Sequence, residues 1–289
     1  MSIRLGCVGC GKWARKLAES FRACGAEIVA YDRQAPVRPG FFARNTLGHG
    51  PLDYDGTFGV RTPWRDQLAD KSIDAIVAVA PPEVTTEVAL ACAAAGKAVM
   101  ATKPLFDHPE RITAPFYVDF WRLWSEAHQS AKASGDCVSI VLKGAGPHRD
   151  FPGMFDYGPH CVAAVLDIAA GRSVRLVDYH RSDCQSGEVY LAQYMIGGEL
   201  VRGGTLVDIE FGDGATEGIR RVHWHDERAA DTVHETPTHI DLEPKEAIMQ
   251  KFCRSFLSDV SEGFVSTTLL DYSREGMRML REIREKSRE

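Results

Sequence analysis

The sequence of 289 residues lacks the long apolar runs and the basic stretches that mark several classes of protein. No window approaches the roughly eighteen consecutive apolar residues of a membrane-spanning helix. The first residues lack a basic segment followed by an apolar one, so we expect no signal peptide. A net charge of -6 makes nucleic acid or an anionic membrane surface an unfavourable partner. We therefore expect a cytoplasmic protein that binds neither.

The sequence also lacks a complete set of metal-ligating residues. Its eight cysteines are scattered along the chain, which is typical of reduced thiols in a cytosol. Cys7 and Cys10 form a C-x-x-C pair, and a redox pair or half a zinc site is the alternative interpretation. No second pair stands at ligand spacing, and no carboxylate or cysteine completes a set with His223 and His225. We predict no metal site.

The first part of the chain alternates between strand-like and helix-like patterns. A chain of this length exceeds the usual size of one domain, so two domains are expected. Apolar runs at 73–80 and 98–102 read as buried strands, and Pro81-Pro82 followed by 83–95 reads as a helix closed by Gly96. Strands with few polar positions predict a parallel, doubly wound sheet, and we assign this Rossmann domain to residues 1–119.

After residue 120 the pattern changes. A helix is expected at 120–133 and a strand at 137–143. Later segments alternate with period two, as in Val207, Ile209 and Phe211 or in Val222 and Trp224. We therefore expect residues 120–289 to form an α+β domain with a mainly antiparallel open sheet. Apolar residues at helical spacing predict a last helix at about 268–286.

A glycine turn follows the first apolar run. Gly9 permits a tight turn, Gly11 lets the backbone approach a pyrophosphate, and Ala14 keeps the following helix close to the strand. The phosphates would lie at the helix N-terminus, where free N–H groups and the helix dipole favour negative charge. This layout predicts a dinucleotide-binding βαβ unit. We include Lys12 and Trp13, which follow the turn, among the cofactor-binding candidates.

The choice between NAD and NADP depends on two neighbouring residues. Asp32 ends the second apolar run about twenty residues beyond the glycines, where a carboxylate accepts hydrogen bonds from a ribose 2′-OH. The same carboxylate would repel a 2′-phosphate, whereas Arg33 would attract one. We expect NAD or NADP as the cofactor and favour NAD.

Three ordered motifs carry a family resemblance. The first is the glycine turn. The second combines Ala80-Pro81-Pro82, which follows one predicted strand, with Lys103-Pro104, which follows the next predicted strand. The third is Asp156-Tyr157-Gly158-Pro159-His160. In these motifs the chain resembles the glucose-fructose oxidoreductase/inositol dehydrogenase (Gfo/Idh/MocA) family. The resemblance implies that Ala80, Pro81 and Pro82 lie at the cofactor and that Lys103 reaches both nicotinamide and substrate. It also implies that Asp156 and His160 are catalytic, and that the C-terminal helix returns to the first domain.

The chain departs from the family pattern at several positions. Thr102 stands where the family has a glutamate, and Ala163 where an aspartate is common. We expect the helix that follows the lysine-proline pair in the family to be reduced here to residues 106–111. We expect this trimming to reshape the pocket near Tyr117 and Arg122, so the substrate need not be inositol or glucose. These two residues and Tyr157 are the substrate-binding candidates.

The chemistry also follows from the residues themselves. Hydride transfer from an alcohol needs a base for the hydroxyl proton and a stabilising charge on the oxygen. His160 titrates near neutral pH, which suits the base. Lys103 follows a parallel strand, where ligands of α/β sheets bind, and burial would lower its pKa enough to share the proton. Asp156 could orient the imidazole, bind a substrate hydroxyl or cap a helix.

These observations predict an NAD(P)-dependent oxidoreductase acting on a hydroxyl or keto carbon of a sugar, a sugar derivative or a similar polar metabolite. One alternative is a regulatory dinucleotide-binding protein without catalysis. Another is an enzyme that recycles its NAD during elimination or glycoside cleavage. Apolar residues left over on the sheet of the second domain indicate a subunit interface, so we expect a homodimer or homotetramer.

Overall fold

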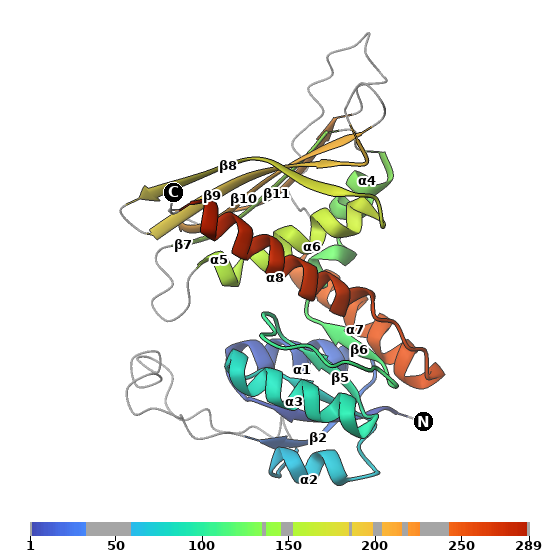
Figure 1. Cartoon of the computed structure of the whole chain (residues 1–289). Coiled ribbons are helices and arrows are strands. Elements are labelled where there is room, and N and C mark those ends of the chain that lie inside the picture. The colour runs from blue at the N-terminus through green and yellow to red at the C-terminus, as the bar shows by residue number, and fades with distance from the viewer. Residues whose placement is uncertain are drawn as a thin grey trace. The chain divides into compact units, whose positions relative to one another are not determined.

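The computed structural model describes the residues 2–32, 59–134, 137–145, 153–184, 187–198, 204–215, 219–225 and 243–287. The chain divides into two compact units, each with its own sheet (Figure 1). The first unit comprises Met1–Asp119 and Met249–Leu270, and the second comprises Phe120–Ile248 and Asp271–Glu289. Within the described part of the chain, no helix is both long and apolar enough to cross a membrane.

The sheet of the first unit has six strands, and every neighbouring pair is parallel. Its order is β3-β2-β1-β4-β5-β6. The strands are β1 (Arg4–Val8), β2 (Glu27–Asp32), β3 (Val60–Arg61), β4 (Ala75–Ala78), β5 (Ala98–Ala101) and β6 (Phe116–Val118). All residues of β4, β5 and β6 are buried, as expected for parallel strands covered on both faces. The predicted Rossmann fold is confirmed.

The first unit contains the helix predicted after Pro81-Pro82 and three others. They are α1 (Lys12–Ala23), α2 (Trp64–Ala69), α3 (Pro82–Ala95) and, from Met249 onward, α7 (Lys245–Glu262). Pro82 opens α3, and Gly96 closes it in the left-handed conformation with φ 64°. The chain places β2 and β3 on one side of β1 and β4 on the other. The topological switch point, where open α/β sheets bind ligands, therefore lies between β1 and β4.

Aromatic side chains fix α7 within the first unit. The ring of Phe256 meets Phe21 at 5.9 Å and Tyr117 at 5.2 Å between centroids. The Tyr117 hydroxyl donates to Asp259 Oδ2 at 2.7 Å. The resemblance implied instead that the last helix, α8 (Thr268–Lys286), returns to the first domain. From Asp271 onward α8 is part of the second unit, and its packing against the first domain stays a prediction.

The sheet of the second unit is mainly antiparallel, as predicted. Its order is β11-β7-β10-β9-β8, and only the β7–β10 pair is parallel. The strands are β7 (Cys137–Ala145), β8 (Val174–Cys184), β9 (Gly187–Ile196), β10 (Thr205–Ala215) and β11 (Ile219–His225). Val207, Ile209 and Phe211 are buried and Asp208 is exposed, so the predicted alternation is confirmed. The side chains of Val222 and Trp224 lie outside the described part of the structure.

The helices of the second unit lie along one face of its sheet (Figure 1). They are the 3-10 helix η1 (Trp121–Trp124), α4 (Glu126–Ser134), α5 (Gly153–Asp156), α6 (Gly158–Ala169) and α8 from Asp271. The single helix expected at 120–133 is therefore wrong, because the chain breaks between η1 and α4. Ser125 causes the break: its Oγ accepts the backbone N–H of His128 at 3.2 Å, which caps α4.

Candidate active site

The glycine turn between β1 and α1 leaves room for an anion. Gly9 has φ 100°, and its N–H donates to the Asp32 carbonyl at 2.9 Å. A Cβ at this position would collide with the carbonyl group of Val79. Gly11 caps α1 with φ -73° and ψ 179°, and a Cβ there would meet nothing within 4 Å. The first N–H groups of a helix have no partner within the helix, so the N-terminus of α1 is suited to hold an anion.

Asp32 ends β2 opposite Val8, the last residue of β1. Its Oδ2 accepts the backbone N–H of Trp64 at 2.9 Å, which ties the carboxylate to the start of α2. The Arg65 guanidinium lies 4.3 Å from the ring centroid of the buried Trp64. The sequence argument missed Trp64, although Pro63 directly before a helical pattern is a signal for a helix start. Arg33 lies outside the described residues.

Residues 80–82 lie beside the glycine turn. A Cβ on Gly9 would come within 3.3 Å of the Ala80 nitrogen. The buried hydroxyl of Thr85 donates to the Ala80 carbonyl at 2.9 Å, and its oxygen lies 3.1 Å from the Ala80 nitrogen. Pro81 caps α3 and Pro82 is its first residue. The structure thus brings Gly9 and Ala80 together at the switch point between β1 and β4.

Lys103 follows β5 on the same edge of the sheet. The preceding residue, Thr102, donates its backbone N–H to the Ala78 carbonyl at 3.0 Å, and Lys103 is half-buried. The Lys103-Pro104 peptide bond is cis. No helix interrupts the connection from β5 to β6, all of which the structure describes. Because the strands are parallel, Lys103, Gly9 and Ala80 all stand at their carboxyl ends.

Trp13 links α1 to the last strand of this sheet. Its indole N–H donates to Asp119 Oδ2 at 2.8 Å, although the two residues are 106 positions apart. Asp119 is only 1 % exposed, and its backbone N–H donates to the Ala101 carbonyl at 2.9 Å. Lys12, the first residue of α1, is exposed. The sequence argument missed Asp119, whose position as the one acid within the apolar run 116–121 was an available signal.

Tyr117, a candidate for substrate binding, is buried in β6. Its hydroxyl donates to Asp259 and lies 2.9 Å from Ser255 Oγ. Burial, with a contribution from Asp259, raises the pKa of this phenol well above its ordinary value. The hydroxyl therefore joins β6 to α7, and the role of Tyr117 in substrate binding stays a prediction.

His160 lies in the first turn of α6 in the second unit. Its backbone N–H donates to the Tyr157 carbonyl at 3.1 Å, and the residue is 8 % exposed. The imidazole meets Phe120 at 6.0 Å and Trp121 at 6.4 Å between ring centroids, both edge to face. These two aromatic rings restrict how the imidazole can turn.

Asp156 and Tyr157 stand between two helices. Asp156 is the last residue of α5, and the half-buried Tyr157 occupies the cap position of α6. The interpretation of Asp156 as a helix N-cap is therefore wrong. One continuous helix carrying Asp156 and His160 on a single face is also not formed, because Tyr157 separates the two helices.

Two cationic side chains border the aromatic ring next to His160. The Arg122 guanidinium lies 4.6 Å from the Trp121 centroid, and Lys245 Nζ lies 5.2 Å from it. Arg122 was a candidate for substrate binding, whereas no sequence pattern pointed to Lys245, which lies 124 positions after Trp121. Among the described residues no group of three or more histidine, cysteine or acidic side chains is arranged to hold a metal ion.

Comparison with known proteins agrees with this architecture. Residues 3–116 match the family model GFO_IDH_MocA, described as an oxidoreductase family with an NAD-binding Rossmann fold. No curated protein matches the chain significantly.

Solved structures with the same fold cover nearly the whole chain. Myo-inositol 2-dehydrogenase from Lactobacillus plantarum is 15% identical, with a TM-score of 0.72 over 100% of this chain and 98% of that one. Scyllo-inositol dehydrogenase from Lactobacillus casei, with bound NAD(H) and scyllo-inositol, is 13% identical, with a TM-score of 0.70 over 99% and 96%. A levoglucosan dehydrogenase in complex with NADH is 13% identical, with a TM-score of 0.68 over 99% and 97%.

Proposed function

Because residues 3–116 match the model of the Gfo/Idh/MocA oxidoreductase family with an NAD-binding Rossmann fold, we propose that the chain is an NAD(P)-dependent dehydrogenase or reductase. Its substrate is a CH–OH group, or the corresponding keto group, of a sugar, a sugar derivative or a similar polar metabolite. The observation that carries this proposal is the glycine turn. Gly9 has a positive φ that favours glycine, and a Cβ on Gly11 would meet nothing within 4 Å at the N-terminus of α1.

The residues at this edge of the sheet fit a dinucleotide. The N–H groups around Gly11 would hold the pyrophosphate, with Ala80–Pro82 beside it. Asp32, oriented by the Trp64 N–H, would accept a hydrogen bond from the 2′-hydroxyl of the adenosine ribose. A 2′-phosphate at this position would meet the negative carboxylate, so NAD is the favoured cofactor. A bound nicotinamide would supply the hydride acceptor for oxidation of the carbinol carbon and the hydride donor for the reverse reaction.

The chain's own residues transfer the hydroxyl proton and stabilise the charge on the substrate oxygen. His160 takes the hydroxyl proton while the C–H bond breaks, and it returns the proton in the reverse direction. The Lys103 ammonium donates to the same oxygen and stabilises the alkoxide charge that develops there. Asp156, Tyr157 and Arg122 contact other polar groups of the substrate.

One observation supports a carbohydrate-like substrate, and a second concerns which compound it is. The similar structures are dehydrogenases named for inositols and levoglucosan, which are polyhydroxylated rings. The chain also differs from the family pattern at Thr102 and Ala163 and has no helix between β5 and β6. These differences support a substrate other than inositol or glucose.

A screen of oxidisable sugars, inositols and sugar acids with NAD and NADP, followed by keto compounds with the reduced cofactors, tests the proposal. The readout is the absorbance of reduced nicotinamide, and Lys103→Ala is the negative control. Turnover that the control lacks supports the proposal. A protein that binds NADH but turns over no compound would be a regulatory binding protein instead. Product formation without net change in absorbance would indicate a cofactor-recycling elimination or glycoside cleavage.

The outer face of the second sheet supports a proposal on assembly. Tyr190 and Ala192 of β9 point into the core, whereas Leu191 between them is 38 % exposed. Val177 on the neighbouring β8 is 43 % exposed. Exposed apolar side chains on an open sheet are typical of subunit contacts, and we propose a homodimer or homotetramer formed through this face.

A further inference from the structure

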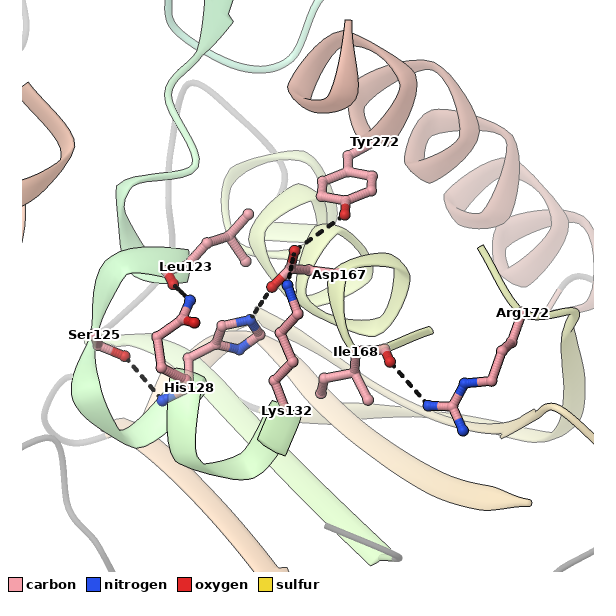
Figure 2. Close-up of polar contacts among 9 residues, drawn as sticks. Leu123, Ser125, His128, Lys132, Asp167, Ile168, Arg172 and Tyr272 are labelled. Carbon is pink, nitrogen blue, oxygen red and sulfur yellow. Dashed lines mark hydrogen bonds and ion pairs between the residues drawn. The ribbon is translucent and has the colours of Figure 1, made fainter. Parts of the chain in front are cut away.

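A buried carboxylate in the second unit receives three hydrogen-bond donors. Asp167 of α6 is 8 % exposed, and its Oδ2 lies 2.8 Å from His128 Nε2. Its Oδ1 accepts from Lys132 Nζ at 2.9 Å and from the Tyr272 hydroxyl at 3.0 Å. Figure 2 shows these side chains converging on Asp167 from α4 and α8. One carboxylate thus holds three helices together.

Asp167 follows His160 on the same helix by seven residues, two helical turns, so both side chains lie on one face of α6. The segment 120–132 contacts both of them. Phe120 and Trp121 at its beginning meet the His160 ring, and His128 meets Asp167 about two turns further on. This segment is therefore attached to α6 at two points, one at each end.

The last helix, α8, runs antiparallel along α6. Tyr272 contacts Asp167, Gly276 faces Val162, and Leu280 faces Gly158. A Cβ on Gly276 would come within 2.7 Å of Val162 Cγ2, and one on Gly158 within 2.7 Å of Leu280 Cδ2. The two glycines allow close approach but make no directional bond. Of these three contacts between α8 and α6, the directional one is the hydrogen bond from the Tyr272 hydroxyl to Asp167.

The charge of Asp167 depends on these donors. Burial alone would raise the pKa of its carboxyl group, but the hydrogen bonds and charges of His128 and Lys132 lower that pKa below its ordinary value. Hydrogen bonds between ionised groups are shorter and stronger than neutral ones. The ionised carboxylate therefore ties α6 to α4 and α8.

We propose that Asp167 is a positioning residue, which sets the place of the His160 imidazole through α6 and uses His128, Lys132 and Tyr272 as anchors. The proposal rests on the proposed function in one respect, namely that His160 takes part in the chemical step. Small displacements of a catalytic group cost large factors in rate, about a hundredfold for 1 Å. Loss of an anchor that lets α6 shift thus lowers turnover without touching the cofactor.

The first experiment needs no substrate. The histidine ring Cε1–H signals of the full-length protein are recorded by NMR, and His160→Gln identifies the His160 signal. We expect Asp167→Asn and Tyr272→Phe to shift this signal. Arg278→Ala is the matched control on α8, because Arg278 pairs with Glu275 and Glu282 on the exposed side and its loss should leave the signal in place.

The second experiment uses any substrate found in the screen. Asp167→Asn should lower kcat roughly ten- to a hundredfold while the Kd for NADH stays within twofold, and Tyr272→Phe should do the same to a smaller extent. If Asp167→Asn does not fold, Tyr272→Phe tests the positioning role alone, because it removes one hydrogen-bond donor to Asp167 and keeps His128 and Lys132 in place.

The outcomes separate the two proposals. An unchanged His160 signal in a variant of lower melting temperature would mean that the cluster only stabilises the fold, and the positioning role would be overturned. A shifted signal in a protein that turns over no substrate would support the positioning role and count against the dehydrogenase. A shifted signal with unchanged kcat would also overturn the positioning role.

Discussion

Replacing Gly11 and Gly9 in turn by alanine is a matched test of the cofactor site, because the same methyl group is added two residues apart. At Gly11 the backbone conformation, φ -73° and ψ 179°, suits any residue, and the new Cβ meets nothing within 4 Å. At Gly9 the φ of 100° disfavours side chains, and the Cβ would collide with the Val79 carbonyl group. Gly11→Ala should therefore lose cofactor affinity, and Gly9→Ala should lose stability.

The expected magnitudes follow from these two environments. A glycine at an N-cap is better than alanine by some tenths of a kcal/mol, and alanine gains about 0.4–1 kcal/mol by restricting the unfolded chain. The stability of Gly11→Ala should thus stay close to that of the wild type. Each N–H bond to a charged group contributes about 1.5–3 kcal/mol, so keeping the pyrophosphate off one N–H weakens binding roughly ten- to a hundredfold. For Gly9→Ala, backbone strain of about 1–3 kcal/mol adds to the collision.

Fluorescence titration with NADH measures binding, and a thermal melt measures stability. We expect Gly11→Ala to melt within a degree or two of the wild type but to bind NADH at least tenfold more weakly. Gly9→Ala should melt several degrees lower. Wild-type affinity in Gly11→Ala would refute the reasoning, since the pyrophosphate would not approach the backbone at this turn.

Four further results are expected. Lys103→Ala and His160→Ala should each lower turnover by about 10²–10⁴-fold and leave NADH affinity unchanged, measured by steady-state kinetics and titration; turnover within a few fold of wild type would place the chemistry elsewhere. Asp32→Asn keeps an acceptor for the Trp64 N–H but removes the charge, so the ratio of NADPH to NADH affinity should rise; an unchanged ratio would contradict the assigned ribose contact. Asp167→Asn should lower the free energy of unfolding by about 3 kcal/mol near neutral pH, as expected when a buried pair loses one charge. Because folding lowers the pKa of Asp167 below 3.8, its contribution is present above that pH and is lost as the pH falls through the folded-state pKa. Urea unfolding should be measured near neutral pH and at an acidic pH below the folded-state pKa. The difference in the free energy of unfolding between variant and wild type should be smaller in acid, and an equal difference at the two pH values would argue against an ionised Asp167. Light scattering at micromolar concentration should show a dimer or tetramer, and a monomer would remove the proposed interface.

The first unit was predictable because its signals are local. Gly9, the Pro81-Pro82 pair and Gly96 each act on the backbone at their own position through φ or a missing N–H. Buried parallel strands also leave runs without polar residues that are visible in the sequence. Element types and approximate boundaries could therefore be predicted from short windows.

The missed features depend on distant partners. Ser125 interrupts an apolar pattern of helical spacing because it caps α4, and the first turn of that helix carries His128 to Asp167. The Trp13–Asp119 bond joins residues more than a hundred positions apart. No local pattern records such pairings. For the same reason, the sequence shows that Tyr117 is aromatic and polar, but it does not show that the hydroxyl donates to Asp259 of α7.

The first unit is discontinuous in the chain, which has a consequence for synthesis on the ribosome. When residue 119 has emerged, Phe21 and Tyr117 still lack Phe256, which follows more than a hundred residues later. The aromatic surface formed by residues 1–119 therefore stays exposed while the segment up to residue 248 is synthesised. A fragment ending at residue 119 should therefore aggregate or depend on chaperones, and supplying residues 249–270 should rescue it.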